Sequence, residues 1–110
     1  MGKAANSSIS LKQIHVTDNF WNKYVHLVKD VIIPYQWDIL NDKLEDVETS
    51  HCIENFKIAA GEKEGEFQGA VFQDTDVAKW LEAVGFVLNY ERDEKLEELA
   101  DETIELIGRA

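Results

Sequence analysis

Hydrophobic positions recur with a helical period along much of this chain, most clearly between residues 77 and 90. One stripe follows a period of about 3.6 residues: Val77, Trp80, Leu81, Val84 and Leu88. Further apolar residues widen that stripe past half of the circumference: Ala78, Phe86, Val87 and Tyr90. The polar seam that remains is thin, with Lys79, Glu82 and Asn89. A helix of this kind is typical of a core position, packed on several sides.

A second helix is predicted from residue 94 to residue 109, with one apolar face and one acidic face. The apolar face consists of Leu96, Leu99, Ala100, Thr103, Ile104 and Ile107. Asp93 is placed to cap this helix and Arg109 lies in its last turn, as the helix dipole favours. Because the connection between the two helices is very short, we expect an antiparallel hairpin with one inner and one outer helix.

The rest of the chain is also predicted to be mainly helical. Residues 1–8 are small and polar and are expected to be a disordered tail, and residues 9–16 favour one short edge strand. Thr17 or Asp18 is expected to cap a long helix that continues to Leu40, with a kink at Pro34. After a polar loop at 41–50, a short helix at 51–60 is expected to be capped by Thr49 or Ser50 and to end at Gly61.

Composition excludes several classes of partner. The chain has 110 residues and a formal net charge of −11, so its field repels phosphate backbones and anionic membranes. No apolar run approaches the length of about 18 residues that crosses a bilayer, and the amino terminus lacks the apolar core of a signal peptide. The single cysteine, Cys52, excludes an internal disulfide and fits a reducing compartment. We therefore expect neither nucleic acid nor membrane as a partner. We also expect a cytoplasmic location, the alternative being a protein whose export signal has been removed.

Several local motifs occur in a characteristic order: Phe20-Trp21, the run from Val31 through Pro34 to Trp37, the helix from His51 to Gly61, and FQDTDVAKWLEA at residues 72–83. In this order they resemble the amino-terminal end of the glycoside hydrolase family 127 β-L-arabinofuranosidases. One departure is Ala78, where members of that family commonly carry tyrosine. The resemblance covers nearly the whole chain.

This resemblance implies an all-α fold in which residues 9–110 form the first helices of an (α/α)6 catalytic barrel, as a fragment of a longer enzyme. That enzyme would hydrolyse terminal β-L-arabinofuranosyl linkages with retention, using a zinc-bound cysteine thiolate. Its acid/base glutamate and nucleophilic cysteine belong to later segments, so we expect no catalytic residue, metal ligand or cofactor within this chain and no turnover by the chain alone. The implied partners are an arabinose-containing oligosaccharide or glycoconjugate and the remainder of the same chain. With part of the barrel missing, the apolar face of the 77–90 helix should be exposed.

The candidate substrate-binding residues are Phe72, Gln73 and Asp74, which come just before the predicted inner helix. An aromatic ring and an amide at this point could pack against and hydrogen-bond a pentose. Alternatively, Phe72 staples the helix start against Trp80 or Val77 and Gln73 satisfies a loop carbonyl.

Two acids, Asp74 and Asp76, could be the carboxylate pair of a glycosidase. Residues two apart on a helix do not face each other, however, so we favour a capping or dipole role for Asp74. Lys79 is expected to pair with Glu82.

Cys52 adjoins His51, but neighbours on a helix diverge by about 100° and make a poor chelate. We favour a buried structural thiol. The tryptophans Trp21, Trp37 and Trp80 could form a sugar-stacking platform, although core packing is the usual role of such side chains.

A second hypothesis from a different class is a stand-alone acidic helical module that binds a partner protein through the broad face of the 77–90 helix. The length of the chain favours this hypothesis, and the motif at residues 72–83 favours the glycosidase.

Overall fold

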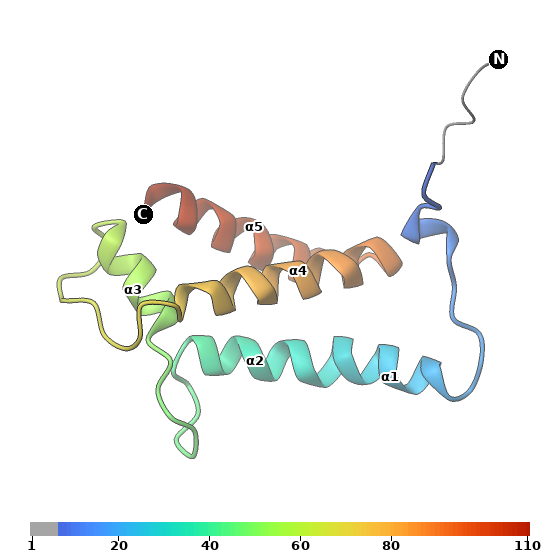
Figure 1. The fold of residues 1–110 in the computed structure, drawn as a ribbon, viewed down its shortest axis with the longest axis horizontal. Helices are drawn as coiled ribbons and strands as arrows, with labels where there is room; N and C mark the ends of the chain where they lie inside the picture. The colour runs from blue at the N-terminus through green and yellow to red at the C-terminus, as the bar shows by residue number, and fades with distance from the viewer. Residues whose placement is uncertain (1–6) are drawn as a thin grey trace.

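A computed structural model describes residues 7–110, and its regular elements are all helical (Figure 1). After a 3-10 turn, η1 (Leu11–Gln13), come α1 (Trp21–Leu27), the π-helix η2 (Val28–Ile32), α2 (Ile33–Leu40), α3 (Cys52–Ala59), α4 (Asp74–Tyr90) and α5 (Glu94–Arg109). The all-α prediction is confirmed. Residues 1–6 of the predicted disordered tail lie outside the described residues.

The edge strand predicted for residues 9–16 is wrong, since this segment contains η1 and residues 7–110 contain no strand. A strand needs a neighbour to accept its backbone hydrogen bonds. Here the phenol of Tyr90 takes that place, because its hydroxyl accepts from the N–H of Val16 at 3.2 Å and donates to the carbonyl of Val16 at 3.5 Å.

The helix predicted to run through Pro34 is continuous from Trp21 to Leu40. Of the two expected caps, Asp18 is the one used, because its Oδ1 accepts from the N–H groups of Phe20 at 2.9 Å and Trp21 at 2.7 Å. Proline lacks an N–H and crowds the carbonyl one turn earlier. The turns directly before Pro34 widen into the π-helix η2, which accommodates this crowding without ending the helix.

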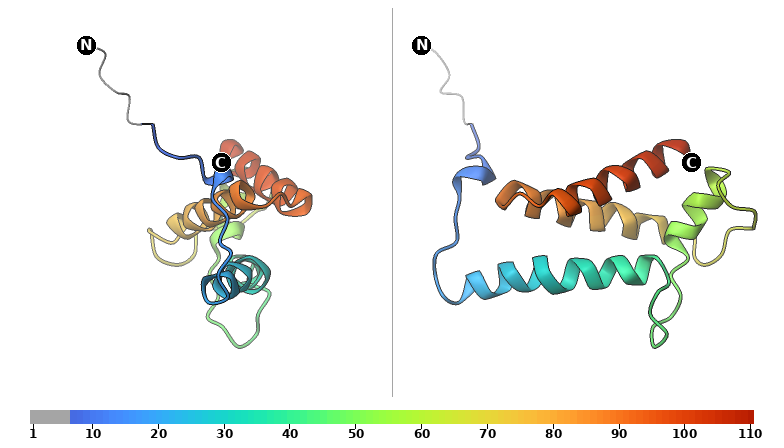
Figure 2. Two further views of the ribbon diagram at one scale, coloured as in Figure 1. Left: turned by 90° about the vertical axis from the view of Figure 1, so that its right-hand side faces the viewer. Right: turned by 180° about the vertical axis from the view of Figure 1, so that it is seen from behind.

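The central element is α4, which contacts α2, α3, α5 and η1. Figures 1 and 2 show α4 between α5 and the α1–α2 rod, with α5 running antiparallel to it. The predicted inner and outer helical hairpin is therefore confirmed, with residues 91–93 as the connection. Asp93 caps α5 as expected, since its Oδ1 accepts from the N–H of Leu96 at 3.1 Å.

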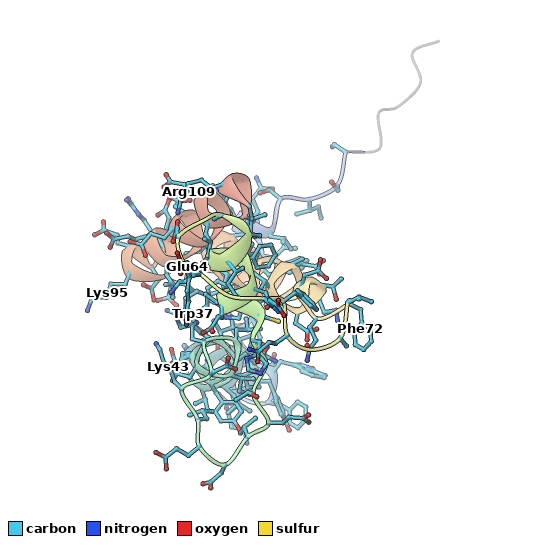
Figure 3. All side chains as sticks on the ribbon, turned by 90° about the vertical axis from the view of Figure 1, so that its left-hand side faces the viewer. Trp37, Lys43, Glu64, Phe72, Lys95 and Arg109 are labelled. Carbon is cyan, nitrogen blue, oxygen red and sulfur yellow. The ribbon has the colours of Figure 1, made fainter. Side chains whose placement is uncertain are left out.

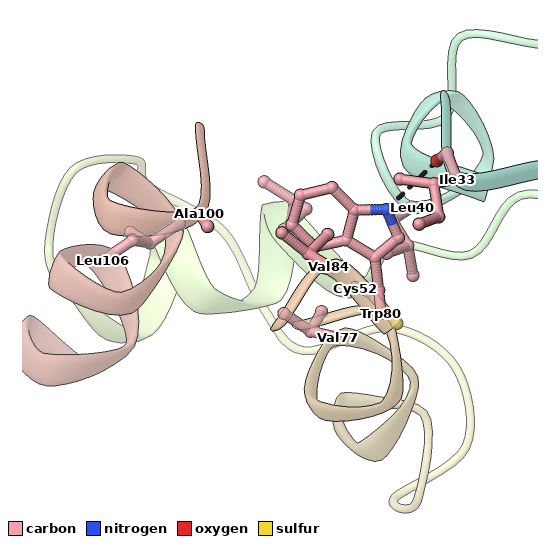
Figure 4. Packing of buried hydrophobic residues seen from close by; sticks show 9 residues of the cluster. Ile33, Leu40, Cys52, Val77, Trp80, Val84, Ala100 and Leu106 are labelled. Atoms are coloured by element: carbon pink, nitrogen blue, oxygen red, sulfur yellow. Dashed lines mark hydrogen bonds between the residues drawn. The ribbon is translucent and has the colours of Figure 1, made fainter. Parts of the chain in front are cut away.

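The core surrounds Trp80, whose side chain is 2% exposed (Figure 4). Its indole Nε1 donates to the carbonyl of Ile33 at 3.1 Å, and its ring lies 4.5 Å from that of Trp37. The other buried apolar residues come from four helices: Ile33, Leu40, Cys52, Ile53, Val77, Val84, Ala100 and Leu106. Trp80 and Trp37 are therefore core residues, whereas Trp21 is 61% exposed on the surface.

The exposed apolar surface lies elsewhere than predicted. Within α4, Phe86 is the large hydrophobic residue that stays exposed, because neighbouring helices cover most of the others. The exposed apolar side chains lie mainly on the α1–α2 rod: Phe20, Trp21, Tyr24, Leu27, Val28, Val31, Ile32 and Tyr35. The apolar face of α5 is largely the predicted one, with one exchange: Leu106 is buried, whereas Ile104 is 55% exposed.

Candidate functional site

The three candidate rim residues lie where the loop after α3 enters α4, and α3 fixes this loop in two places. The side-chain amide of Asn55 donates to the carbonyl of Gln68 at 2.8 Å and accepts from the N–H of Gln68 at 3.0 Å. The thiol of Cys52 donates to the carbonyl of Gln73 at 2.8 Å. At the start of the loop, Gly61 ends α3 with a left-handed backbone (φ 74°), as predicted. Both ends of the loop are thus tied to one helix.

The carboxamide of Gln73 is tied to its own loop. Its Oε1 accepts from the backbone N–H of Ala70 at 2.9 Å. Gly69 makes room for this contact, because a Cβ at that position would lie 1.9 Å from the Oε1 atom of Gln73. The backbone of Gly69 also has a φ of 94°, which other residues rarely adopt. The sequence offered the alternative that the carboxamide of Gln73 bonds to a loop carbonyl. In the structure the carboxamide instead accepts a hydrogen bond from a loop N–H.

A hollow of about 380 Å³ lies between the end of α2, residues 48–50 and the first turns of α4. Its wall combines amide, carboxylate and hydroxyl groups with one indole: Gln36, Ile39, Leu40, Glu48, Thr49, Ser50, Gln73, Asp76, Lys79 and Trp80. Of the three predicted rim residues, Gln73 lines this hollow. A small cavity with a few convergent polar groups and an apolar wall suits a small hydroxylated ligand.

Phe72 is 68% exposed and stands at the outer edge of the molecule (Figure 3). It therefore does not staple the helix start against Trp80 or Val77, which are both buried. The backbone carbonyl of Phe72 instead accepts from the hydroxyl of Thr75 at 2.7 Å, which secures the first turn of α4.

Asp74 is the exposed first residue of α4, and the position before the helix, Gln73, makes no side-chain capping bond. The capping role expected for Asp74 is therefore not seen, and its carboxylate is placed to interact with the helix dipole. Asp76 pairs with Lys79 at 2.9 Å, so the pair predicted between Lys79 and Glu82 is wrong. An acid one turn before a lysine has the more favourable order on a helix.

Cys52 is buried, as predicted, at 1% exposure (Figure 4). Burial raises the pKa of its thiol, and nearby Asp76, Asp42 and Asp74 raise it further, against the lowering effect of a bond with Ser50. A thiol with a raised pKa stays protonated at neutral pH and is a poor nucleophile.

His51 precedes α3 with a left-handed backbone (φ 57°) and is turned toward Asp42. The carboxylate of Asp42 accepts from the N–H groups of Ser50 at 2.6 Å and His51 at 3.0 Å. The cap predicted at Thr49 or Ser50 is wrong, because the residue before α3 is His51 and it makes no side-chain capping bond. The contact with Asp42 holds Ser50, which lines the hollow, in place.

Metal ligands do not gather in the described part of the chain. Residues 7–110 contain no group of three or more histidine, cysteine, aspartate or glutamate side chains that could hold an ion. The zinc that the resemblance implies for a longer enzyme thus has no ligand set among these residues. The helices of the same region include none that is long and apolar enough to cross a membrane.

The arrangement defines a class: an all-α segment in which an inner helix and an outer helix form a hairpin beside a polar hollow. The chain belongs to the GH127 β-L-arabinofuranosidase family, whose catalytic-domain model matches residues 13–110. A similar protein is the non-reducing end β-L-arabinofuranosidase of Bifidobacterium longum subsp. longum, 38% identical over 109 residues. A similar structure is the crystal structure of a GH127 β-L-arabinofuranosidase from Geobacillus stearothermophilus T6, with a TM-score of 0.84 and 59% sequence identity.

These relatives are much longer than this chain. The match with the Bifidobacterium protein covers 88% of the chain and 17% of that protein. The match with the Geobacillus structure covers 86% of the chain and 15% of that structure. The resemblance inferred from the local motifs is therefore confirmed, for a segment that corresponds to a small share of the relatives' length.

Proposed function

We propose that this chain forms the amino-terminal wall of a GH127 catalytic barrel that hydrolyses terminal β-L-arabinofuranosyl linkages with retention. The observation that carries the proposal is the family match over residues 13–110, together with a structural likeness at 59% identity. Catalytic groups would come from the rest of the polypeptide, as would ligands for zinc. The chain alone would not turn over substrate.

Within that barrel, the hollow beside Gln73 would form part of the rim of the pocket for the arabinofuranosyl group. The supporting features are its volume of about 380 Å³ and its polar lining beside the indole of Trp80. Phe72 would contact the substrate or its aglycone from outside the hollow, where its ring is 68% exposed. Asp74 would contribute charge near this rim. An arabinose-containing oligosaccharide or glycoconjugate would be the partner.

The remainder of the same polypeptide would cover the exposed apolar side of the α1–α2 rod. That side presents large residues such as Trp21 at 61% and Val31 at 54% exposure, more than an isolated small domain usually leaves open. A cytoplasmic location is part of the proposal and is supported by the single cysteine, Cys52, which is free and buried.

A hybrid enzyme tests this function. The aligned segment of the Geobacillus enzyme would be replaced by the corresponding residues of this chain, and turnover of an aryl β-L-arabinofuranoside would be measured. The hybrid should retain most of the parent's kcat/KM, since the helical scaffold and rim are preserved. A matched hybrid with Phe72→Ala should raise KM, whereas Phe67→Ala, another exposed aromatic on the same loop, should not.

A hybrid that melts like its parent and has no activity would contradict the proposal. The stand-alone interaction module would then be favoured, and the free chain should behave as a tight monomer that binds no hydrophobic dye.

A further inference from the structure

We propose that Gln73 is a fixed hydrogen-bond donor for the ligand of the hollow, and that Gly69 is the residue that fixes its orientation. This inference rests on the proposed function for the identity of the ligand, and on the structure alone for the orientation. The inference specifies the chemical group that a ligand must place against Gln73, namely an oxygen that accepts a hydrogen bond.

The orientation of the carboxamide follows from its partner. A backbone N–H can only donate, so the atom that faces Ala70 at 2.9 Å must be the oxygen Oε1. The atoms nearest to the point where a Cβ of Gly69 would be all belong to Gln73, with Oε1 at 1.9 Å, Cδ at 3.1 Å and Nε2 at 3.6 Å. The oxygen is turned toward the loop backbone, and the amide nitrogen is turned away from it.

The backbone that carries this side chain is equally constrained. The carbonyl of Gln73 accepts from the thiol of Cys52, and the loop five residues earlier is held by Asn55. A group that is already held in its binding orientation loses little conformational freedom when the ligand arrives. Gln73, which lines the hollow, therefore has its amide nitrogen turned away from the loop on a preorganised support.

Besides Gln73, the wall of the hollow carries three charged residues, Glu48, Asp76 and Lys79. Asp76 and Lys79 are engaged with each other at 2.9 Å, which leaves the acceptor Glu48 as the remaining charged group of the wall. The two N–H bonds of Nε2 need acceptors, and a neutral polyhydroxylated ligand supplies them through hydroxyl or ring oxygens. A furanoside has several oxygens of this kind.

Gln73→Glu separates the two roles of the side chain. A carboxylate still accepts from the N–H of Ala70 but has no N–H to donate, so the loop should persist while the donor is lost. The matched control is Gln68→Glu, which adds the same charge to the same loop at a residue whose backbone, not its side chain, bonds to Asn55. Gly69→Ala is the third variant, because its Cβ would displace the carboxamide.

The test is an NMR experiment on the 110-residue chain in solution. Hydrogen exchange at the backbone amide of Ala70 measures whether the loop keeps its bond to Gln73. Titration with methyl β-L-arabinofuranoside measures the affinity for the ligand. Protection of Ala70 should be the same in the unmodified chain and in Gln73→Glu, and should fall in Gly69→Ala. The glycoside should shift the side-chain amide signal of Gln73, and Gln73→Glu should weaken its affinity by about three- to tenfold while Gln68→Glu leaves it unchanged.

Equal affinity for Gln73→Glu and the unmodified chain would overturn the donor role. Unchanged protection of Ala70 in Gly69→Ala would overturn the role of Gly69. If the glycoside fails to bind the unmodified chain while the hybrid enzyme is active, the hollow is not a sugar site and the rim role proposed for it is wrong, whereas the barrel-wall role and the hydrolytic activity of the whole enzyme stand. If both fail, the proposed function is wrong.

Discussion

Replacing Trp80 with alanine should remove a large part of the stability of this chain. The indole is 2% exposed, packs against Trp37 at 4.5 Å and donates to the carbonyl of Ile33 at 3.1 Å. Loss of a buried tryptophan side chain costs about 3–5 kcal/mol, because both its burial and its cavity are lost. A small domain is stable by about 5–15 kcal/mol in total. The substitution therefore removes a large part of the free energy of unfolding.

Thermal unfolding followed by circular dichroism is the assay. Since about 1 kcal/mol corresponds to a shift of about 4–8 °C in a domain of this size, Trp80→Ala should lower Tm by at least about 12 °C. Trp80→Phe keeps most of the volume and loses the bond to Ile33, so its cost should be smaller, with about 0.5–1.5 kcal/mol for the bond itself. Trp21→Ala is the matched control, because Trp21 is 61% exposed and should cost less than about 1 kcal/mol.

The order Trp80→Ala, Trp80→Phe, Trp21→Ala is the test of the reasoning. If Trp21→Ala were as destabilising as Trp80→Ala, the centre of the core would be misplaced. If Trp80→Ala left the melting curve unchanged, Trp80 would be a surface residue and a sugar-stacking role would return.

Two further predictions concern titratable groups. The thiol of Cys52 should react slowly with Ellman's reagent in the native chain and rapidly in denaturant, because it is buried and burial raises its pKa; fast native labelling would show that the junction between α3 and the loop is open. The bond between Lys29 and Glu91 at 2.7 Å raises the pKa of Lys29 and lowers the pKa of Glu91. Its stabilisation should thus be present at neutral pH and be lost as pH falls through the lowered pKa of Glu91 or rises through the raised pKa of Lys29. Glu91→Gln should flatten the acid limb of a stability profile, whereas Glu98→Gln, at an exposed site on α5, should leave that limb unchanged.

The helices could be predicted from the sequence because their signals are local. The period of apolar residues in α4 and the short connection to α5 define the hairpin without further information. Continuity through Pro34 could be predicted from the unbroken apolar period, although the widened turns of η2 could not. The edge strand failed because β-type residues form a strand only beside a partner, and Val16 is bound instead by Tyr90, far along the chain.

The parts of the site that escaped prediction depend on contacts across the chain. Nothing local to Asp42 indicates that its carboxylate binds the backbone of residues 50 and 51. Asn55 reads as an ordinary helical residue until the loop at Gln68 is placed beside it. Gly69 is one of three glycines between α3 and α4, and its need for space becomes clear only with the side chain of Gln73 in position.

The two ends of α4 are stabilised by different kinds of interaction, which bears on how such a segment serves a larger barrel. At its amino-terminal end, the tethers from Cys52 and Asn55 satisfy backbone groups of the entering loop with specific partners, so the rim is shaped by contacts within this chain. At its carboxyl-terminal end, an apolar groove of about 510 Å³ runs between η1, α1 and α4, with Phe86 on its wall.

Hydrogen bonds require fixed geometry, whereas apolar surface requires only to be covered. A hydroxylated substrate needs donors and acceptors at set positions, and the polar end supplies them locally. The apolar end can accept whatever later helices of the same polypeptide pack against it. The segment is therefore arranged so that the surface closest to the proposed substrate depends least on the rest of the barrel, and the surface farthest along α4 depends on it most.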